Sequence, residues 1–260
     1  MLSTDLLSHY RQISRQSLTV VDVETSGYKP ISGRVIEVSV LHATLTDGIK
    51  HQQTHLINPG VQVPDTITRF TGITQAMVNT AAPAAEVWPQ YLPLLETGIL
   101  TAHNLSFDYG FIQSEFQHQG ISYVRPATQQ FCTVILARLM LPQLPSRSLP
   151  DLVRHFEFNV GRSHRAEADT LACWLLAELL LREIQNEEDE VLLARFAEQW
   201  LPLRDVAELL SCSGKQARSL LYHAGVSPRT VGRHNTVMYQ RGAVERVLQA
   251  QSNSVQTFWF

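Results

Sequence analysis

The first residues that could do chemistry together are two carboxylates near the start of the chain. Asp22 and Glu24 close the segment Leu18–Glu24, whose other residues are apolar or β-branched and typical of a buried central strand. Residues two apart on a strand point to the same face, so these carboxylates should lie side by side. Adjacent buried anions repel each other unless a cation lies between them. The pair therefore indicates either a metal site or, more simply, a strand end that faces solvent.

A third acid lies at an expected strand-to-helix junction. The segment HNLSFD, residues 103–108, follows a short apolar strand over Ile99–Ala102. We expect Ser106 to cap the helix that follows, which runs to about Gly120. Asp108 then falls in the first turn, near the positive end of the helix dipole. Taken alone, Asp108 is better explained as a favourable N-terminal helix acid.

A histidine and a fourth acid occur five residues apart, later in the chain. His164 comes just before a helix expected over Ala166–Gln185, and Asp169 lies within the early turns of that apolar helix. An acid in such a helix needs a compensating charge, whereas His164 alone would be a capping or surface residue. The four carboxylates together supply the oxygen ligands that hard cations prefer. Two such cations ~4 Å apart can activate water and stabilise the leaving oxygen of a phosphodiester.

The order D-x-E, H-N-x-x-F-D and H-x-x-x-x-D resembles the DEDDh 3′–5′ exonucleases, which include the proofreading epsilon subunit of bacterial DNA polymerase III. The flanking segments DVETSG, RVIEV, INPG, TGIT, AHNLSFDYGF, LARLMLP and HRAEADT agree with that family along residues 18–182. The resemblance implies an RNase H-like fold and two Mg²⁺ or Mn²⁺ ions per active site. It also implies that Asp22 bridges both ions, that Glu24 and Asp169 complete the first site, that Asp108 holds the second, and that His164 is the general base.

Further residues near these motifs are expected to contact the substrate. In the family that the sequence resembles, residues placed like Thr25, Ser26, Asn104 and Phe107 contact the 3′ end of the nucleic acid. At its spacing from Phe111, Phe107 is better explained as a core residue. The more exposed aromatic candidate for stacking on a base is Phe70.

The elements that must position these residues follow from hydrophobic periodicity. Strands are expected over Val35–Leu45 and Lys50–Ile57, joined by a turn at Thr46-Asp47-Gly48. Helices are expected over residues 84–96, 134–141, 148–156 and 191–200. Strands first and then mostly helices predict an α/β domain with a mixed sheet flanked by helices.

The charge distribution separates two parts of the chain. Residues 1–200 carry 14 Lys and Arg against 21 Asp and Glu, whereas residues 201–260 carry 7 against 3. A basic C-terminal part favours a polyanionic partner. We therefore expect an exonuclease domain over residues 1–186, an acidic and helical linker over 187–200, a DNA-binding module over 201–252, and an aromatic tail over 253–260.

The C-terminal module reads as helix, tight turn, helix, β-wing and final helix. The segments LRDVAELL (203–210) and GKQARSLLYHA (214–224) flank the turn, VGRHNTVMY (231–239) is the wing, and residues 241–249 form the last helix. This pattern resembles the small winged helix-turn-helix domains of excisionase-like and MerR-like proteins. Lys215, Arg218, Arg229 and Arg233 are the residues expected to meet phosphates. A protein-docking or purely structural module is the alternative.

Other features bound the function and its setting. No apolar run reaches the ~18 residues of a membrane helix, so no membrane partner is expected. No signal peptide is evident, and the three cysteines form neither a disulfide framework nor a zinc ligand set, so the cytoplasm is the expected location.

DNA is the expected substrate, in repair or proofreading, and trimming of RNA ends is the alternative. A third alternative, an inert DNA-binding regulator, is disfavoured because all five catalytic positions are present. Gln256 with Trp259-Phe260 loosely resembles the glutamine and aromatic tails that bind a sliding clamp. A sliding clamp or a polymerase is therefore a candidate partner.

Overall fold

A computed structural model describes residues 1–232 and 235–256, with side chains as far as Gln251. The chain forms two compact units. The first comprises Gln12–Leu136 and Pro145–Glu183 and holds most of the expected exonuclease domain, so we call it the exonuclease unit. The second comprises Met1–Arg11, Ala137–Leu144 and the chain from Ile184 onward. No helix among the described residues is long and apolar enough to cross a membrane.

The exonuclease unit is built on a five-stranded mixed sheet with the strand order β3-β2-β1-β4-β5. The strands are β1 (Leu18–Thr25), β2 (Val35–Thr44), β3 (Gly48–Leu56), β4 (Ile99–Ala102) and β5 (Gln130–Cys132). The first three strands pair antiparallel, whereas β4 lies parallel to β1 and β5 parallel to β4. This is the predicted α/β class with an RNase H-like mixed sheet. The strands β1 to β4 lie where the sequence predicted them.

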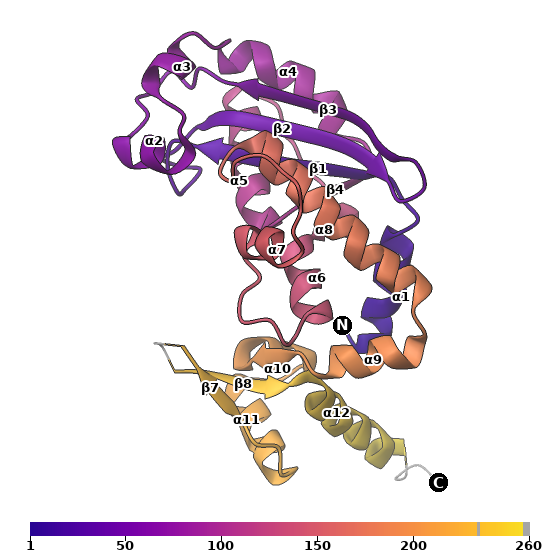
Figure 1. The fold of residues 1–260 in the computed structure, drawn as a ribbon. Coiled ribbons are helices and arrows are strands. Elements are labelled where there is room, and N and C mark those ends of the chain that lie inside the picture. The colour runs from indigo at the N-terminus through magenta and orange to yellow at the C-terminus, as the bar shows by residue number, and fades with distance from the viewer. Residues whose placement is uncertain (233–234, 257–260) are drawn as a thin grey trace. The chain divides into compact units, whose positions relative to one another are not determined.

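Helices cover both faces of this sheet (Figure 1). The helices of this part of the chain are α2 (Asp65–Thr71), α3 (Gln75–Asn79), α4 (Ala84–Leu95), α5 (Leu105–His118), α6 (Thr133–Met140), α7 (Leu149–His155) and α8 (Ala166–Asn186). The C-terminal ends of α6 and α8 belong to the second unit. Alternate residues of β1, such as Val21 and Val23, pack with Trp88 of α4 and Phe111 of α5 in one core. The opposite face carries Asp22 and Glu24, because side chains alternate along a strand. The α8 helix crosses that face (Figure 1).

The second unit contains a small three-stranded sheet and several short helices. Its elements are α1 (Ser3–Ile13, which continues into the exonuclease unit), α9 (Asp189–Ala197), β6 (Trp200–Pro202), α10 (Leu203–Leu209), α11 (Gly214–His223), β7 (Arg229–Val231), β8 (Thr236–Gln240) and α12 (Arg241–Gln256). The strand order is β6-β8-β7, with antiparallel pairing. Val206, Ala217, Leu221, Tyr239 and Val244 lie in the core of this unit.

Several local predictions were wrong or incomplete. The helix expected over 191–200 ends at Ala197, and Trp200–Pro202 instead forms β6, which pairs with β8. The N-cap of α5 is Asn104, in a left-handed conformation with φ 80°, and not Ser106. Asparagine tolerates this conformation because its short polar side chain bonds locally. The elements α1, α2, α3 and β5 were not predicted.

The expected linker is mostly helical, and all three cysteines are free. Of the residues 187–188, which separate α8 from α9, Glu188 is the N-cap of α9. Arg233 and residues 257–260 of the aromatic tail lie outside the described residues.

Candidate active site

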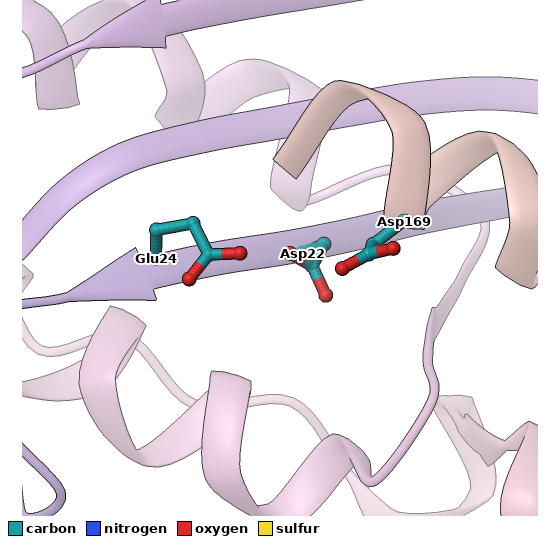
Figure 2. Close-up of side chains that lie close together, drawn as sticks. All are labelled: Asp22, Glu24 and Asp169. Carbon is teal, nitrogen blue, oxygen red and sulfur yellow. The ribbon is translucent and has the colours of Figure 1, made fainter. Parts of the chain in front are cut away.

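Three acids meet where α8 crosses β1. One ligand oxygen from each of Asp22, Glu24 and Asp169 lies within 4.8 Å of the other two. Figure 2 shows the first two side chains leaving the same face of the strand and Asp169 descending from the helix beside Asp22. The sequence predicted both the shared face of Asp22 and Glu24 and the early helical position of Asp169. The structure thus brings together three of the four predicted metal ligands.

Asp108 is the fourth acid, and it approaches the same place from α5. It lies in the first turn of that helix, as predicted, and its side chain is buried. Its Oδ1 accepts a hydrogen bond of 3.2 Å from the backbone N–H of Val23, which lies between the two acids of β1. Asp108 is not one of the three acids that meet within 4.8 Å. It is near enough to raise the pKa of Asp22 by repulsion.

Burial and mutual repulsion raise the pKa values of the whole cluster. Burial and then the charges of Asp108 and Asp169 hold the pKa of Asp22 well above its usual range. Burial, followed by repulsion from Asp169, raises the pKa of Glu24 to about 8. Burial likewise raises the pKa of Asp108 to about 8, and burial raises that of Asp169. Without a cation, these groups cannot all be ionised at neutral pH, so the donor set fits a hard divalent cation.

His164 lies at the start of the loop-to-helix transition that carries Asp169. Its backbone adopts a left-handed conformation with φ 63°, and its N–H donates a 2.9 Å hydrogen bond to Asp169 Oδ2. Its imidazole stacks on Phe70, with ring centroids 3.8 Å apart and planes inclined by 32°. Phe70 itself is 57% exposed. The predicted general base and the predicted stacking aromatic are therefore in contact with each other.

A fifth buried acid, Glu37, holds this region together, and the sequence analysis missed its role. Glu37 pairs with Glu24 across β2 and β1 and is only 1% exposed. The Arg165 guanidinium lies 2.6 Å from Glu37 Oε1, and the N–H of Ala166 donates a 2.8 Å hydrogen bond to Oε2. Because Arg165 follows His164 and Ala166 begins α8, Glu37 fixes the histidine and Asp169 relative to the sheet. The signal in the sequence was the acid inside the apolar segment RVIEV.

A second buried ion pair shapes the loop after β1. Glu115 of α5 accepts two 2.8 Å hydrogen bonds from the Arg34 guanidinium and one of 2.9 Å from the N–H of Val35. The backbone N–H of Arg34 donates a 2.9 Å hydrogen bond to Ser26 Oγ, which connects this ion pair to the loop. The hydroxyl of Thr25 donates to the carbonyl of Gly27 at 2.6 Å. Thr25 and Ser26, predicted to contact the substrate, are thus buried residues whose hydroxyls bond within the loop.

The other predicted substrate contacts lie in different surroundings. Asn104 is exposed at the start of α5, and no side-chain cap hydrogen bond occupies it there. Phe107 is half-buried and packs against Phe111 at 5.0 Å between ring centroids. This packing agrees with the core interpretation of Phe107. Asn104 and Phe70 are the exposed members of the predicted substrate-binding set.

Comparisons with known proteins show which proteins this chain resembles. The chain is 30% identical over 191 residues to the PolC-type DNA polymerase III of Clostridium perfringens, and this match covers 73% of the chain and 13% of that protein. It is 28% identical over 176 residues to the 3′-5′ exonuclease DinG of Bacillus subtilis, covering 67% of this chain and 18% of that protein. The chain therefore corresponds to a small part of the length of these curated relatives.

Among solved structures, exonuclease X in complex with 5′-overhanging duplex DNA superposes with a TM-score of 0.51. The identity is 23%, and the match covers 69% of this chain and 99% of that one. At this identity the likeness shows the fold alone. The family model described as "Exonuclease" matches residues 19–177, a span that holds all four acids and the histidine. The chain therefore belongs to the exonuclease family.

Proposed function

We propose that the protein is a metal-dependent 3′–5′ exonuclease that removes nucleotides from DNA and releases nucleoside 5′-monophosphates. The observation that carries the proposal is the convergence of Asp22, Glu24 and Asp169, with Asp108 and His164 beside them. Buried acids that repel one another weaken a fold unless they serve a cation, so a purely structural role does not explain them.

Mg²⁺ or Mn²⁺ suits this donor set, because hard cations prefer carboxylate oxygens. Asp22, Glu24 and Asp169 would hold one ion, and Asp22 with Asp108 a second, in line with the family resemblance. Bound there, the ions would supply positive charge to the scissile phosphate and to the leaving oxygen.

The side chains around the ions have distinct tasks in this proposal. The His164 imidazole takes the proton of the attacking water, and the new P–O bond replaces the bond to the 3′ oxygen of the preceding nucleotide. That oxygen leaves with a proton, and the released nucleotide keeps the phosphate on its 5′ side. The hydrogen bond from the His164 N–H to Asp169 ties the base to a metal ligand. Thr25, Ser26, Asn104, Phe107 and Phe70 form the substrate-binding set, in which Phe70 stacks on a base and Thr25 and Ser26 shape the loop through backbone bonds.

DNA is the proposed substrate, for repair or proofreading, because two relatives are a DNA polymerase and a protein named as a 3′-5′ exonuclease. The structure of exonuclease X holds duplex DNA, which also supports this choice. Trimming of RNA ends remains the second candidate, since the same acids serve either polymer. The relation to a polymerase also makes a polymerase or sliding clamp a candidate partner, although most of the tail motif lies outside the described residues.

A time course on matched single-stranded DNA and RNA, each labelled at its 5′ end, tests this function. We expect Mg²⁺ or Mn²⁺ to give a ladder that shortens from the 3′ end of DNA, EDTA to abolish it, and a 3′-blocked strand to survive. Equal degradation of the blocked strand would contradict the proposed polarity. Faster loss of RNA than of DNA would favour the RNA candidate.

A further inference from the structure

The outward face of α11 in the second unit carries exposed cationic and aromatic side chains. Lys215, Arg218, Ser219 and Tyr222 are exposed, and Tyr222 is 79% exposed. Residues three, four and seven apart lie on one face of a helix, so these four form a single stripe. The sequence of α11, GKQARSLLYH, contains no acid. We call this stripe the α11 face.

The helix that bears this face is held firmly from behind. Ser213 caps α11 by accepting a 3.3 Å hydrogen bond from the N–H of Gln216, whose side chain accepts the Ser213 N–H in return at 3.0 Å. Ala217 and Leu221 are buried on the opposite side of the helix, in the core of the second unit. A tight turn at Ser211, with φ 51°, joins α11 to α10. The four outward side chains therefore project from a fixed backbone.

Few acids occur in the part of the chain that carries the α11 face. Residues 201–260 contain three acids: Asp205, Glu208 and Glu245. Asp205 forms an ion pair with Arg204 at 3.1 Å, and Glu245 accepts hydrogen bonds from Arg241 and from the N-terminal Ser3. Glu208 lies on α10. Neither Lys215 nor Arg218 has an acidic neighbour on its own helix.

The β-wing expected from the sequence is present in the second unit. The antiparallel pair β7 and β8 lies next to β6 in the same small sheet. Arg229, expected to meet a phosphate, stacks its guanidinium over the Trp200 ring at 4.8 Å from the centroid. Arg229 lies on β7 and is therefore not part of the α11 face, and its contact with phosphate stays a prediction.

We propose that the α11 face binds duplex DNA in the major groove, with Lys215 and Arg218 on phosphates and Tyr222 as an uncharged contact to the DNA. The choice of DNA rests on the proposed nuclease function. An α-helix with its side chains is ~10–12 Å across, and so α11 fits a major groove ~12 Å wide. In helix-turn-helix proteins the second helix of the pair enters this groove, and α11 holds that place after α10. Tyrosine and arginine also favour protein interfaces, so a protein partner is the competing outcome.

Binding of the full chain to a covalently closed dumbbell duplex in EDTA tests the proposal. This DNA has no 3′ end for the exonuclease site, and EDTA stops hydrolysis. We expect the logarithm of the binding constant to fall linearly with the logarithm of salt concentration. The double variant Lys215→Ala with Arg218→Ala should bind at least about tenfold more weakly at low salt and reduce the slope by roughly 1.8, about 0.9 for each phosphate contact. Tyr222→Ala should weaken binding and leave the slope unchanged, because it removes no charge.

Arg246→Ala is the matched control, since Arg246 is an exposed cation of the same unit on α12, beside a groove lined by Trp200 and Val247. It should leave both affinity and slope unchanged. All variants should degrade a short single-stranded DNA oligomer at the wild-type rate in Mg²⁺. Failure of the DNA-binding proposal can therefore be told apart from failure of the proposed exonuclease function. Wild-type protein that does not bind the dumbbell, an unaffected double variant, or an equal loss in Arg246→Ala would overturn the proposal.

Discussion

The acidic cluster of the exonuclease unit and the α11 face of the second unit carry opposite charges in opposite surroundings. Asp22, Glu24 and Asp169 are largely enclosed and repel one another, whereas Lys215 and Arg218 stand in solvent. Buried charge weakens a fold unless something compensates it, and exposed charge costs almost nothing. The buried cluster would destabilise the fold unless it served a function, so its burial alone points to a functional site. The charges of the α11 face do not destabilise the fold, so the case for their function rests on their arrangement along one side of a well-held helix.

The largest expected effect on activity comes from replacing one acid of the buried cluster. Asp22→Asn should lower the rate of nucleotide release by at least several hundredfold, because each lost metal contact removes several kcal/mol of charge stabilisation, at ~1.4 kcal/mol per tenfold in rate. Product release from a 5′-labelled oligomer in Mg²⁺ measures this. Glu167→Gln is the control, since Glu167 is an exposed acid on the same helix two residues before Asp169. Near-normal activity of Asp22→Asn would refute the metal site.

The next largest effect concerns Glu37, which positions the candidate metal ligands but is not one of them. Glu37→Gln should lower activity about 10- to 100-fold and raise the Mg²⁺ concentration needed for half-maximal rate, as expected for a group that orients metal ligands. The reason is loss of the bonds from Arg165 and Ala166. A Mg²⁺ titration of the rate measures the change. Arg182→Gln, which breaks a partly exposed ion pair with Glu178 on α8, should leave the Mg²⁺ requirement unchanged. An unaltered requirement in Glu37→Gln would remove its positioning role.

A smaller effect is expected at the exposed aromatic that contacts the histidine. Phe70→Ala should raise KM for single-stranded DNA about tenfold, because one base–aromatic stack contributes ~1–3 kcal/mol. It should leave the unfolding temperature nearly unchanged, since Phe70 is 57% exposed. Steady-state kinetics with oligomers of different 3′ bases measures KM and kcat separately. A large fall in kcat with constant KM would instead assign Phe70 to holding His164.

The smallest expected effect is a change in stability with pH. The acidic cluster should produce this change, and the α11 face should not. The folded-state pKa values of Glu24 and Asp108 are about 8, above those of exposed carboxyls, because of burial. The folded protein therefore binds more protons than the unfolded chain between about pH 4 and pH 8. This contribution to stability is fully present below that window and is lost as the pH rises through it. The unfolding temperature of the metal-free protein should fall over this range.

Thermal unfolding in EDTA at several pH values checks this expectation, and Mg²⁺ should restore stability most at the alkaline end. Asp22→Asn should flatten the pH dependence by removing one of the repelling charges. The double variant Lys215→Ala with Arg218→Ala should show the same pH dependence as the wild type, because it removes exposed charges and leaves the buried acids unchanged. A wild-type curve that rises with pH would contradict the buried, repelling cluster.

The sequence indicated the acids of the candidate site more readily than the residues that hold them in place. Asp22, Glu24, Asp108 and Asp169 were ambiguous one by one and were singled out by the order of their three motifs, which resembles the DEDDh exonucleases. Glu37 was not singled out, since its partner Arg165 lies 128 residues away and only folding brings them together. The three-residue strand β6 was also missed: it contains Pro202, and its identity as a strand depends on pairing with β8.

The acids of the candidate site come from the start and the end of the exonuclease unit. Asp22 lies on β1, the first strand of this unit, and Asp169 lies on α8, the last helix of the same unit. A chain emerging from the ribosome therefore holds no complete ligand set until α8 has been made and has packed on the sheet. Any fragment that stops short of α8 lacks Asp169 and should therefore be unable to hold the cation that the proposed function requires.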